Sequence, residues 1–192
     1  GDPVDAILGT RANEFARESL RIKLGLDKPL VNQYFEYLNN LIHGNLGISL
    51  NTQEPVKIII SKALPASLEL AIFAILIASL VGYLIGFLGV VKPESKTDFF
   101  GRIFGISTYA LPPFWAAMLI QIIFAVFLGW LPIGGRLAPG MSYPPSVTGF
   151  LLIDSILNKN LELIFNSFKH LILPSVTLGI LLSGIFSRSL RL

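Results

Sequence analysis

The sequence predicts an all-α protein in which a polytopic membrane helix bundle is joined to a polar helical segment. Residues 70–91 and 103–135 form runs of 22 and 33 residues without an Asp, Glu, Lys or Arg. A helix needs roughly 20 mostly apolar residues to cross a bilayer core, so both runs are long enough. Residues 171–187 form a third uncharged run of 17 residues, which is short but within the range that membrane helices occupy.

The composition agrees with this class. Only 14% of the 192 residues are charged, against about 25% in a typical soluble domain, and the shortage is concentrated after residue 62. The chain has no cysteine, which excludes disulfides, thiol nucleophiles and cysteine zinc sites within it. The net charge of +3 is scattered rather than gathered in a basic run, so nucleic acid is not an expected partner.

Residues 1–63 read as a polar segment with helical patterning. One helix is expected to stop near Gly25, and a second is expected to start near Pro29, with Asp27 as a possible cap, and to end at Gly44. A glycine-punctuated loop follows, and then a short helix beginning at Pro55. His43, at the end of the second helix, is interpreted as a surface or capping residue rather than a metal ligand.

The first membrane span is predicted over residues 64–91. Gly82, Gly86 and Gly89 recur at helical spacing, and such small residues let membrane helices approach closely. Glu69 stands near the start of this span. A carboxylate there could face the bundle interior as a functional group, but an interfacial position or a place near the helix N-terminus is favoured.

The second span is interrupted by Pro112 and Pro113. Proline removes a helix donor and clashes with the preceding turn, and in a membrane the freed groups must be satisfied by protein or by a water-filled cavity. Two readings remain open: a broken helix beside a pathway, and a simple kink with a packing role. Since about eighteen residues follow the prolines, the break lies toward one membrane face and favours a bend in a pathway wall over a mid-membrane site.

The loop charges predict an orientation. Residues 92–102 contain Lys92, Lys96 and Arg102, and short basic loops lie on the cytoplasmic side. The predicted order is an extracytoplasmic helical segment (1–63), a transmembrane helix (64–91), a cytoplasmic loop (92–102), a transmembrane helix kinked at 112–113 (103–131), an extracytoplasmic loop (132–169), a transmembrane helix (170–188) and the start of a cytoplasmic region (189–192). The apolar second half of the long loop, 151–168, is expected to form an interfacial helix.

No catalytic or metal-binding set is predicted. The chain lacks a Gly-x-Ser-x-Gly elbow, a P-loop and a His-Glu-x-x-His zinc pattern. A transporter or channel subunit fits the remaining features best, and a membrane receptor or assembly factor is the alternative. The candidates for contact with a transported solute lie along the second span, although packing or a helix–helix hydrogen bond is the competing interpretation for each. They are Tyr109, Pro112, Trp115 and Gln121.

Several short motifs also carry a family resemblance, and they occur in the expected order. They are LGLDKPL at 24–30, GNLGIS at 44–49 with Asn45 where Asp is usual, LPASLELA at 64–71, PFW at 113–115, WLP at 130–132 and HLILP at 170–174. Together they resemble permease subunits of the peptide/nickel branch of ABC importers, over essentially the whole chain. The absence of an initiator Met and the ending directly after a membrane run predict an interior piece, the N-terminal half without the first span and the C-terminal coupling region.

The resemblance implies a fold like that of type I ABC importer permeases in the plasma (cytoplasmic) membrane, surrounded by membrane lipid. It implies alternating access through two permease subunits, driven by two ATPase subunits and supplied by an extracytoplasmic solute-binding protein. Under this reading the chain is not an enzyme and holds no cofactor, since ATP and Mg would sit on the partner subunits. The implied solutes are peptides, oligosaccharides or nickel complexes. The candidates for contact with the binding protein are Asn45, Gly47, Ser49 and Arg136.

Overall fold

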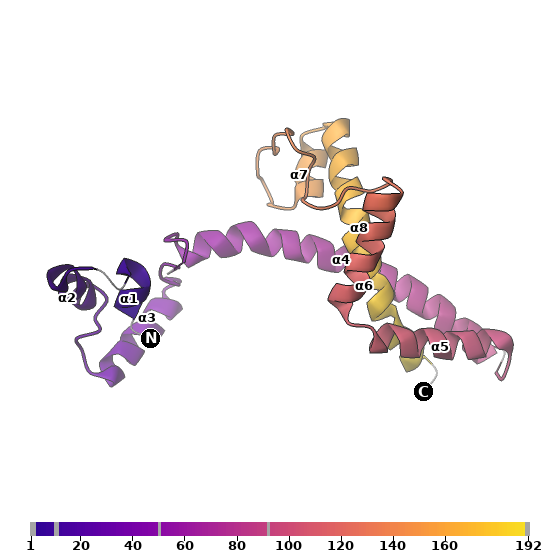
Figure 1. The fold of residues 1–192 in the computed structure, drawn as a ribbon, viewed down its shortest axis with the longest axis horizontal. Coiled ribbons are helices and arrows are strands. Elements are labelled where there is room, and N and C mark those ends of the chain that lie inside the picture. The colour runs from indigo at the N-terminus through magenta and orange to yellow at the C-terminus, as the bar shows by residue number, and fades with distance from the viewer. Residues whose placement is uncertain (1–2, 10–11, 50, 92, 191–192) are drawn as a thin grey trace. The chain divides into compact units, whose positions relative to one another are not determined.

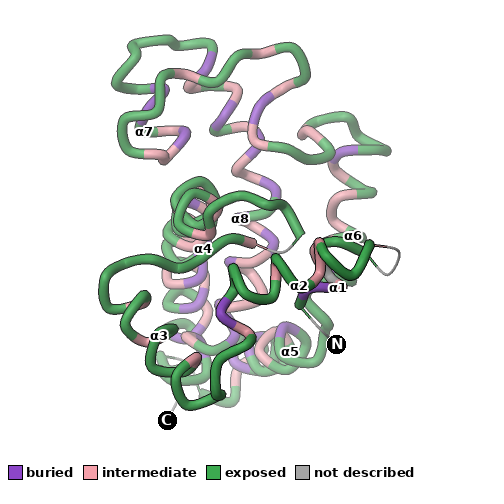
Figure 2. Tube along the Cα trace, turned by 90° about the vertical axis from the view of Figure 1, so that its left-hand side faces the viewer, coloured by how far each residue is buried: buried purple, intermediate pink, exposed green. Residues whose placement is uncertain are grey.

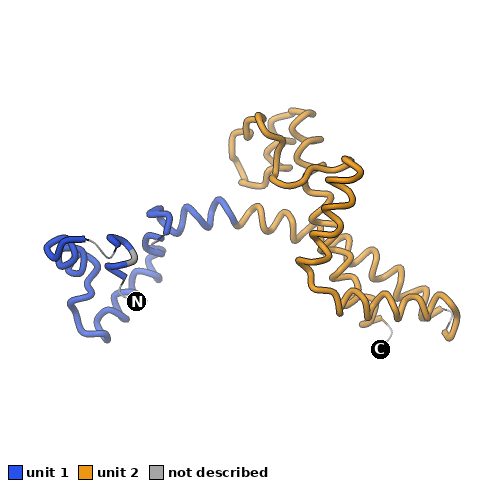
Figure 3. The backbone as a smooth tube through the Cα atoms, in the orientation of Figure 1, with its two compact units in different colours: residues 1–63 blue, residues 64–192 orange. Residues whose placement is uncertain are grey.

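The computed structural model describes residues 3–9, 12–49, 51–91 and 93–190 (Figure 1). Within these ranges the regular structure is helical, with one isolated bridge between Ile48 and Pro55, so the predicted all-α class is confirmed. The chain divides into two compact units, residues 1–63 and 64–192, coloured separately in Figure 3. Lys92, one of the basic residues behind the predicted orientation, lies outside the described residues.

The described part of the first unit contains α1 (Pro3–Leu8), α2 (Glu14–Lys23), α3 (Leu30–Ile42) and the first residues of α4 (Val56–Val91). The Asn13 side chain caps α2 by accepting a hydrogen bond from the Ala16 amide at 2.7 Å. Gly25 follows α2 with φ +69°, the left-handed conformation that lets glycine end a helix. The expected stop at this position is therefore confirmed.

The start of α3 differs from the prediction. Pro29 precedes its first turn as the capping residue and provides no side-chain cap, so Asp27 is not the cap. Instead, the amide of Gln33 reaches back to the carbonyl oxygens of Lys28 at 2.8 Å and Leu26 at 3.4 Å. The helix ends at His43 and Gly44, as expected, and His43 Nδ1 donates to the Asn39 carbonyl at 2.7 Å.

Helix α4 (Val56–Val91) joins two elements that the sequence analysis separated. The short helix expected at Pro55 and the span expected from residue 64 are continuous, with Pro65 inside. A proline removes only one helix donor, and the strongly apolar sequence on its C-terminal side keeps the helix intact. Glu69 consequently lies well inside α4, and its placement near the start of the helix was wrong.

The Pro112–Pro113 pair breaks the chain between α5 (Lys96–Ala110) and α6 (Pro113–Gln121), which continues into the π-helical segment η1 (Ile122–Phe127). The two halves meet at 102°. The residue before a proline is pushed to extended conformations, and both Leu111 (ψ 128°) and Pro112 (ψ 127°) adopt them. Two successive extended residues produce a full break rather than the expected kink.

The start of α5 also differs from the expected loop over residues 92–102. Ser95 caps α5 by accepting from the Asp98 amide at 3.3 Å, so most of that loop is helical. Downstream, the helix expected over 151–168 is divided. Helix α7 (Leu151–Leu157) ends before Lys159, which has φ +52°, and Asn160 caps the 29-residue α8 (Leu161–Ser189).

Within the described residues, α4 and α8 are each long and apolar enough to cross a membrane. If the two halves of the bent pair, α5 and α6 with η1, are taken together as one span, the number of spans is three. These features confirm a multi-pass membrane helix bundle. Figure 1 shows α7 beside one end of α8 and α5 beside the other. A small apolar core of Leu137, Leu151 and Leu163 packs under the loop that leads to α7.

Two stripes of small, buried residues pack α4 against α8. Figure 2 shows buried segments along both helices. The stripe on α4 is Ala74, Ala78, Gly82 and Gly86, and the stripe on α8 is Ser175, Gly179, Ser183 and Ser187. A Cβ on Gly82 would lie 2.5 Å from the Phe186 Cβ and 2.6 Å from the Ser183 carbonyl oxygen. The helices are too close to admit one more methyl group, as the glycine spacing predicts.

This packing makes a direct prediction. Gly82→Ala should lower the melting temperature of the purified protein in detergent, because forcing an extra carbon into a packed interface costs about 1–3 kcal/mol. Gly105→Ala in α5 is the matched control, since a Cβ there meets nothing within 4 Å and alanine favours helix. Equal melting temperatures for the two variants would contradict the close α4–α8 contact.

Candidate functional site

Glu69 lies on a membrane helix and is only 6% exposed. Its Oε2 accepts a hydrogen bond from Arg136 Nη2 at 2.7 Å, and its Oε1 accepts one from the Leu152 backbone amide at 2.7 Å. Arg136 belongs to the loop after η1, and Leu152 to the first turn of α7. The carboxylate therefore faces the interior of the second unit, as the sequence analysis allowed, and an interfacial depth for Glu69 stays a prediction.

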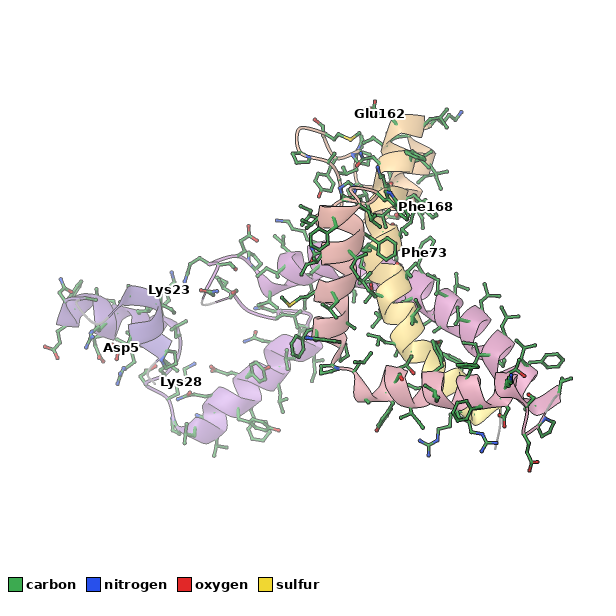
Figure 4. The ribbon with its side chains drawn as sticks, turned by 45° about the vertical axis from the view of Figure 1, so that its right-hand side comes forward. Asp5, Lys23, Lys28, Phe73, Glu162 and Phe168 are labelled. Carbon is green, nitrogen blue, oxygen red and sulfur yellow. The ribbon has the colours of Figure 1, made fainter. Side chains whose placement is uncertain are left out.

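These contacts explain how a carboxylate is tolerated there. Burying an ion costs several kcal/mol unless a charge partner and hydrogen bonds compensate. Arg136 supplies the charge, and Leu152 supplies one of the backbone donors that a helix start leaves unpaired. Glu69 thus fixes the loop after η1 and the start of α7 onto α4. Near this point the rings of Phe73 and Phe168 meet edge to face, with centroids 6.4 Å apart, which joins α4 to α8 (Figure 4).

A cavity of about 290 Å³, here called the Glu69 cavity, opens beside this ion pair. It contains polar groups from three parts of the second unit, among them Ser167 and His170 of α8. His170 is buried, and its Nδ1 lies 2.9 Å from the Asn166 carbonyl oxygen. Because a carbonyl can only accept, Nδ1 donates to it. The lining residues are Ala66, Ser67, Glu69, Leu70, Gly135, Arg136, Leu151, Ser167, His170, Leu171 and Pro174.

A second cavity of about 280 Å³, the Gln121 cavity, shares Gly135, His170 and Pro174 with the first. Gln121 at the end of α6 donates a hydrogen bond from its amide to the Ile133 carbonyl, and Thr177 of α8 also lines the space. His170 therefore borders both cavities. Together they place a buried ion pair, an imidazole, an amide and hydroxyls along one side of α8, which suits the binding of a polar solute but supplies no nucleophile–base pair.

The loop before α7 is held by Asp154, which is buried. Its Oδ1 accepts from the Thr148 amide and hydroxyl, both at 2.8 Å, and its Oδ2 accepts from the Gly149 amide at 3.0 Å. Burial acts most strongly and raises the pKa of Asp154, but the hydrogen bonds from Thr148 and Gly149 outweigh it and leave the pKa below its ordinary value. The loop that carries Arg136 is thus anchored at its far end as well.

The four pathway candidates do not come together. Gln121 lines the Gln121 cavity, whereas Tyr109 is 83% exposed beside a groove between α5 and α8. Pro112 caps α6, and Trp115 is exposed on the same helix. Contact of these residues with solute stays a prediction.

The candidates for binding-protein contact are divided between the two units. Asn45, Gly47 and Ser49 form a tight turn in the first unit: Asn45 Oδ1 accepts from the Gly47 amide at 3.1 Å, and the Ser49 amide donates to the Glu54 carbonyl at 2.9 Å. Arg136 is in the second unit and is paired with Glu69. Binding-protein contact by any of them stays a prediction.

His170 and Ser167 are the residues that the sequence reasoning did not assign to a site. His170 was used only as part of the HLILP motif. A helical projection of 161–189 could have found them, since Ser167, His170 and Pro174 fall on one face at spacings of three and four.

The chain is similar in sequence to proteins of known class. No protein-family model matches the chain. It is 40% identical over 191 residues to the probable D,D-dipeptide transport system permease protein DdpB of Escherichia coli strain K12, a match that covers all of the chain and 56% of that protein. The chain resembles peptide-transport permeases along its whole length.

Two further relatives agree. The di/tripeptide transport system permease protein DppB of Pseudomonas aeruginosa is 38% identical over 193 residues, covering all of the chain and 57% of that protein. The glutathione transport system permease protein GsiC of Escherichia coli O6:H1 is 29% identical, covering all of the chain and 53% of the relative. The chain spans little more than half the length of the curated relatives it matches. The resemblance stated from the motifs is confirmed.

The Glu69–Arg136 pair can be tested by a double-mutant cycle. Arg136→Gln should lower stability strongly, since breaking a buried pair costs about 3–5 kcal/mol, moderated here because the Arg136 side chain is 32% exposed. The double variant Glu69→Gln/Arg136→Gln should recover part of the loss, because no uncompensated charge remains buried. Melting temperatures in detergent provide the readout, and strictly additive losses would contradict the pairing.

Asp154 gives a pH prediction. Because its pKa is lower in the folded protein, its contribution is complete above the unfolded pKa of about 3.9 and is lost as the pH falls through the folded pKa. Asp154→Asn should therefore melt lower than the parent at pH 7, with the gap narrowing below pH 4. The control is Glu162→Gln, which removes an exposed carboxylate from the first turn of α8. A gap independent of pH would remove the proposed role of the charge.

Proposed function

We propose that this chain forms part of the transmembrane permease subunit of an ATP-driven ABC importer that takes up peptides or a related solute, such as an oligosaccharide or a nickel complex. The observation that carries the proposal is similarity along the whole chain to permeases whose names specify dipeptide, di/tripeptide and glutathione transport. The receptor or assembly-factor alternative is not favoured, because these relatives are all permeases.

The architecture supports a transport pathway beside the broken α5–α6 span. The extended residues Leu111 and Pro112 leave backbone groups without helical partners, and at membrane depth such groups need protein or water. The Gln121 cavity lies between α6 and α8, and the Glu69 cavity lies between α4 and α8. In this proposal the 102° bend shapes the wall of the pathway, and the cavities belong to its extracytoplasmic part.

The remaining components follow from the proposed class. ATP hydrolysis resides in two separate ATPase subunits, which carry ATP and Mg, and a second permease subunit completes the pathway. An extracytoplasmic binding protein delivers the solute to residues 1–63 and 132–169. The described basic residues Lys96, Arg102 and Arg188 support this orientation, because all three lie at the proposed cytoplasmic ends of α5 and α8.

Orientation is testable by labelling, since the chain has no cysteine of its own. Three exposed positions are used: Thr52→Cys, Thr97→Cys and Val147→Cys. A membrane-impermeant maleimide should label positions 52 and 147 in intact cells, and position 97 only after permeabilisation. Labelling of position 97 from outside would overturn the orientation.

Transport is tested with the complete transporter in cells that lack their own peptide permease. Gln121→Ala and Trp115→Ala should reduce dipeptide uptake at equal membrane expression, while Val126→Ala, exposed on η1, should leave it unchanged. Uptake that depends on the ATPase partners would support the permease class. If neither Gln121→Ala nor Trp115→Ala changed that uptake, the proposal that these two residues line the pathway would be wrong. Uptake without the ATPase partners would overturn the importer.

A further inference from the structure

A groove of about 460 Å³ runs between α5 and the C-terminal end of α8, well away from the Glu69 and Gln121 cavities. Two of its residues are arginines, and the others are apolar, small or aromatic. The residues of this α5–α8 groove are Gly101, Arg102, Gly105, Ile106, Tyr109, Ala110, Ser187 and Arg188.

One end of the groove is positively charged. Arg102 donates to Asp98 Oδ2 from Nε at 3.1 Å and from Nη2, which leaves its remaining guanidinium donors available. Arg188 is exposed, and no carboxylate among the described residues lies within ion-pair distance of it. Glu94 also acts electrostatically on Arg102, so the unbalanced positive charge of the groove is that of Arg188.

The other end is apolar and open. Along α5, one and two turns beyond Arg102, Ile106 is 69% exposed and Tyr109 is 83% exposed. A Cβ on Gly105 would meet nothing within 4 Å, so the groove is open where the glycine lacks a side chain. An occupant must therefore combine an anionic group with an extended apolar portion.

We propose that the α5–α8 groove binds one anionic phospholipid, with its phosphate between Arg102 and Arg188 and an acyl chain along Ile106 and Tyr109. A groove between helices of a membrane bundle meets lipid directly, and basic pockets between membrane helices select anionic headgroups. A free phosphate would use only the arginine end. A peptide carboxylate would leave the apolar end without an aliphatic partner. This site assigns Tyr109 to a lipid instead of to the transported solute, and it does not otherwise depend on the transport proposal.

The test is native mass spectrometry of the purified chain, released from detergent and titrated with phosphatidylglycerol or phosphatidylcholine. One phosphatidylglycerol should remain bound selectively. Arg188→Gln should weaken this binding roughly fivefold, as expected for one basic residue near an anionic headgroup. Lys57→Gln, an exposed lysine on α4 outside the groove, should leave it unchanged. Equal losses in the two variants, or equal retention of the zwitterionic lipid, would overturn the proposal.

A second variant tests the apolar end with both arginines intact. Gly105→Leu places a side chain into the open groove without a backbone clash, and it should weaken phosphatidylglycerol binding while leaving the melting temperature of the lipid-free protein unchanged or higher. Competition separates the other occupants. Displacement of the lipid by inorganic phosphate at equal concentration, or by a dipeptide, would assign the groove to a soluble anion or to the solute and overturn a lipid site.

Discussion

The close contact between α4 and α8 is the constraint on which the rest of the second unit depends. In a membrane, lipid tails are as apolar as leucine, so helices associate through close packing rather than hydrophobic burial. Here the stripes begin at Ala74 and Ser175 and leave no room for a Cβ at Gly82 or Gly179. The same crowding extends to α5, since a Cβ on Gly184 would overlap the Thr108 hydroxyl.

The contact between α4 and α8 also forms the polar Glu69 cavity, which lies N-terminal to the two stripes on both helices. Glu69 continues the buried face of α4 about one turn before Ala74, where it meets the loop bearing Arg136 and the cavity bordered by His170. A carboxylate at this depth requires its partners, so the loop cannot move away from α4 without exposing or stranding a charge. The result is a polar pocket bordered by Glu69, Arg136 and His170, which is compatible with the solute pathway proposed above.

The sequence was sufficient for the helical class, the membrane runs and the glycine contact at Gly82, because these depend on local spacing and composition. It was not sufficient where partners are distant in the chain. Glu69 and Arg136 are 67 residues apart, and no periodicity links them. The two prolines predicted an interruption of the second span at Pro112–Pro113. The 102° angle was not predictable, because it follows from two consecutive extended residues and from packing on α8. The expected separation of a short helix at Pro55 from the span at 64–91 was wrong, since α4 is one continuous helix with Pro65 inside it.

The measurement that tests this account most directly is cross-linking between α4 and α8. A Cβ built on Gly86 lies 3.1 Å from the Cβ of Leu190, the residue that follows α8, a few tenths of an ångström short of the 3.5–4.5 Å that a disulfide requires. The pair Gly86→Cys/Leu190→Cys also removes the Leu190 methyl group that crowds this contact, and it should oxidise readily within one chain in the membrane. The control pair Gly86→Cys/Ile185→Cys, with Ile185 57% exposed on another face of α8, should not. Equal cross-linking of both pairs, or of neither, would contradict the close contact.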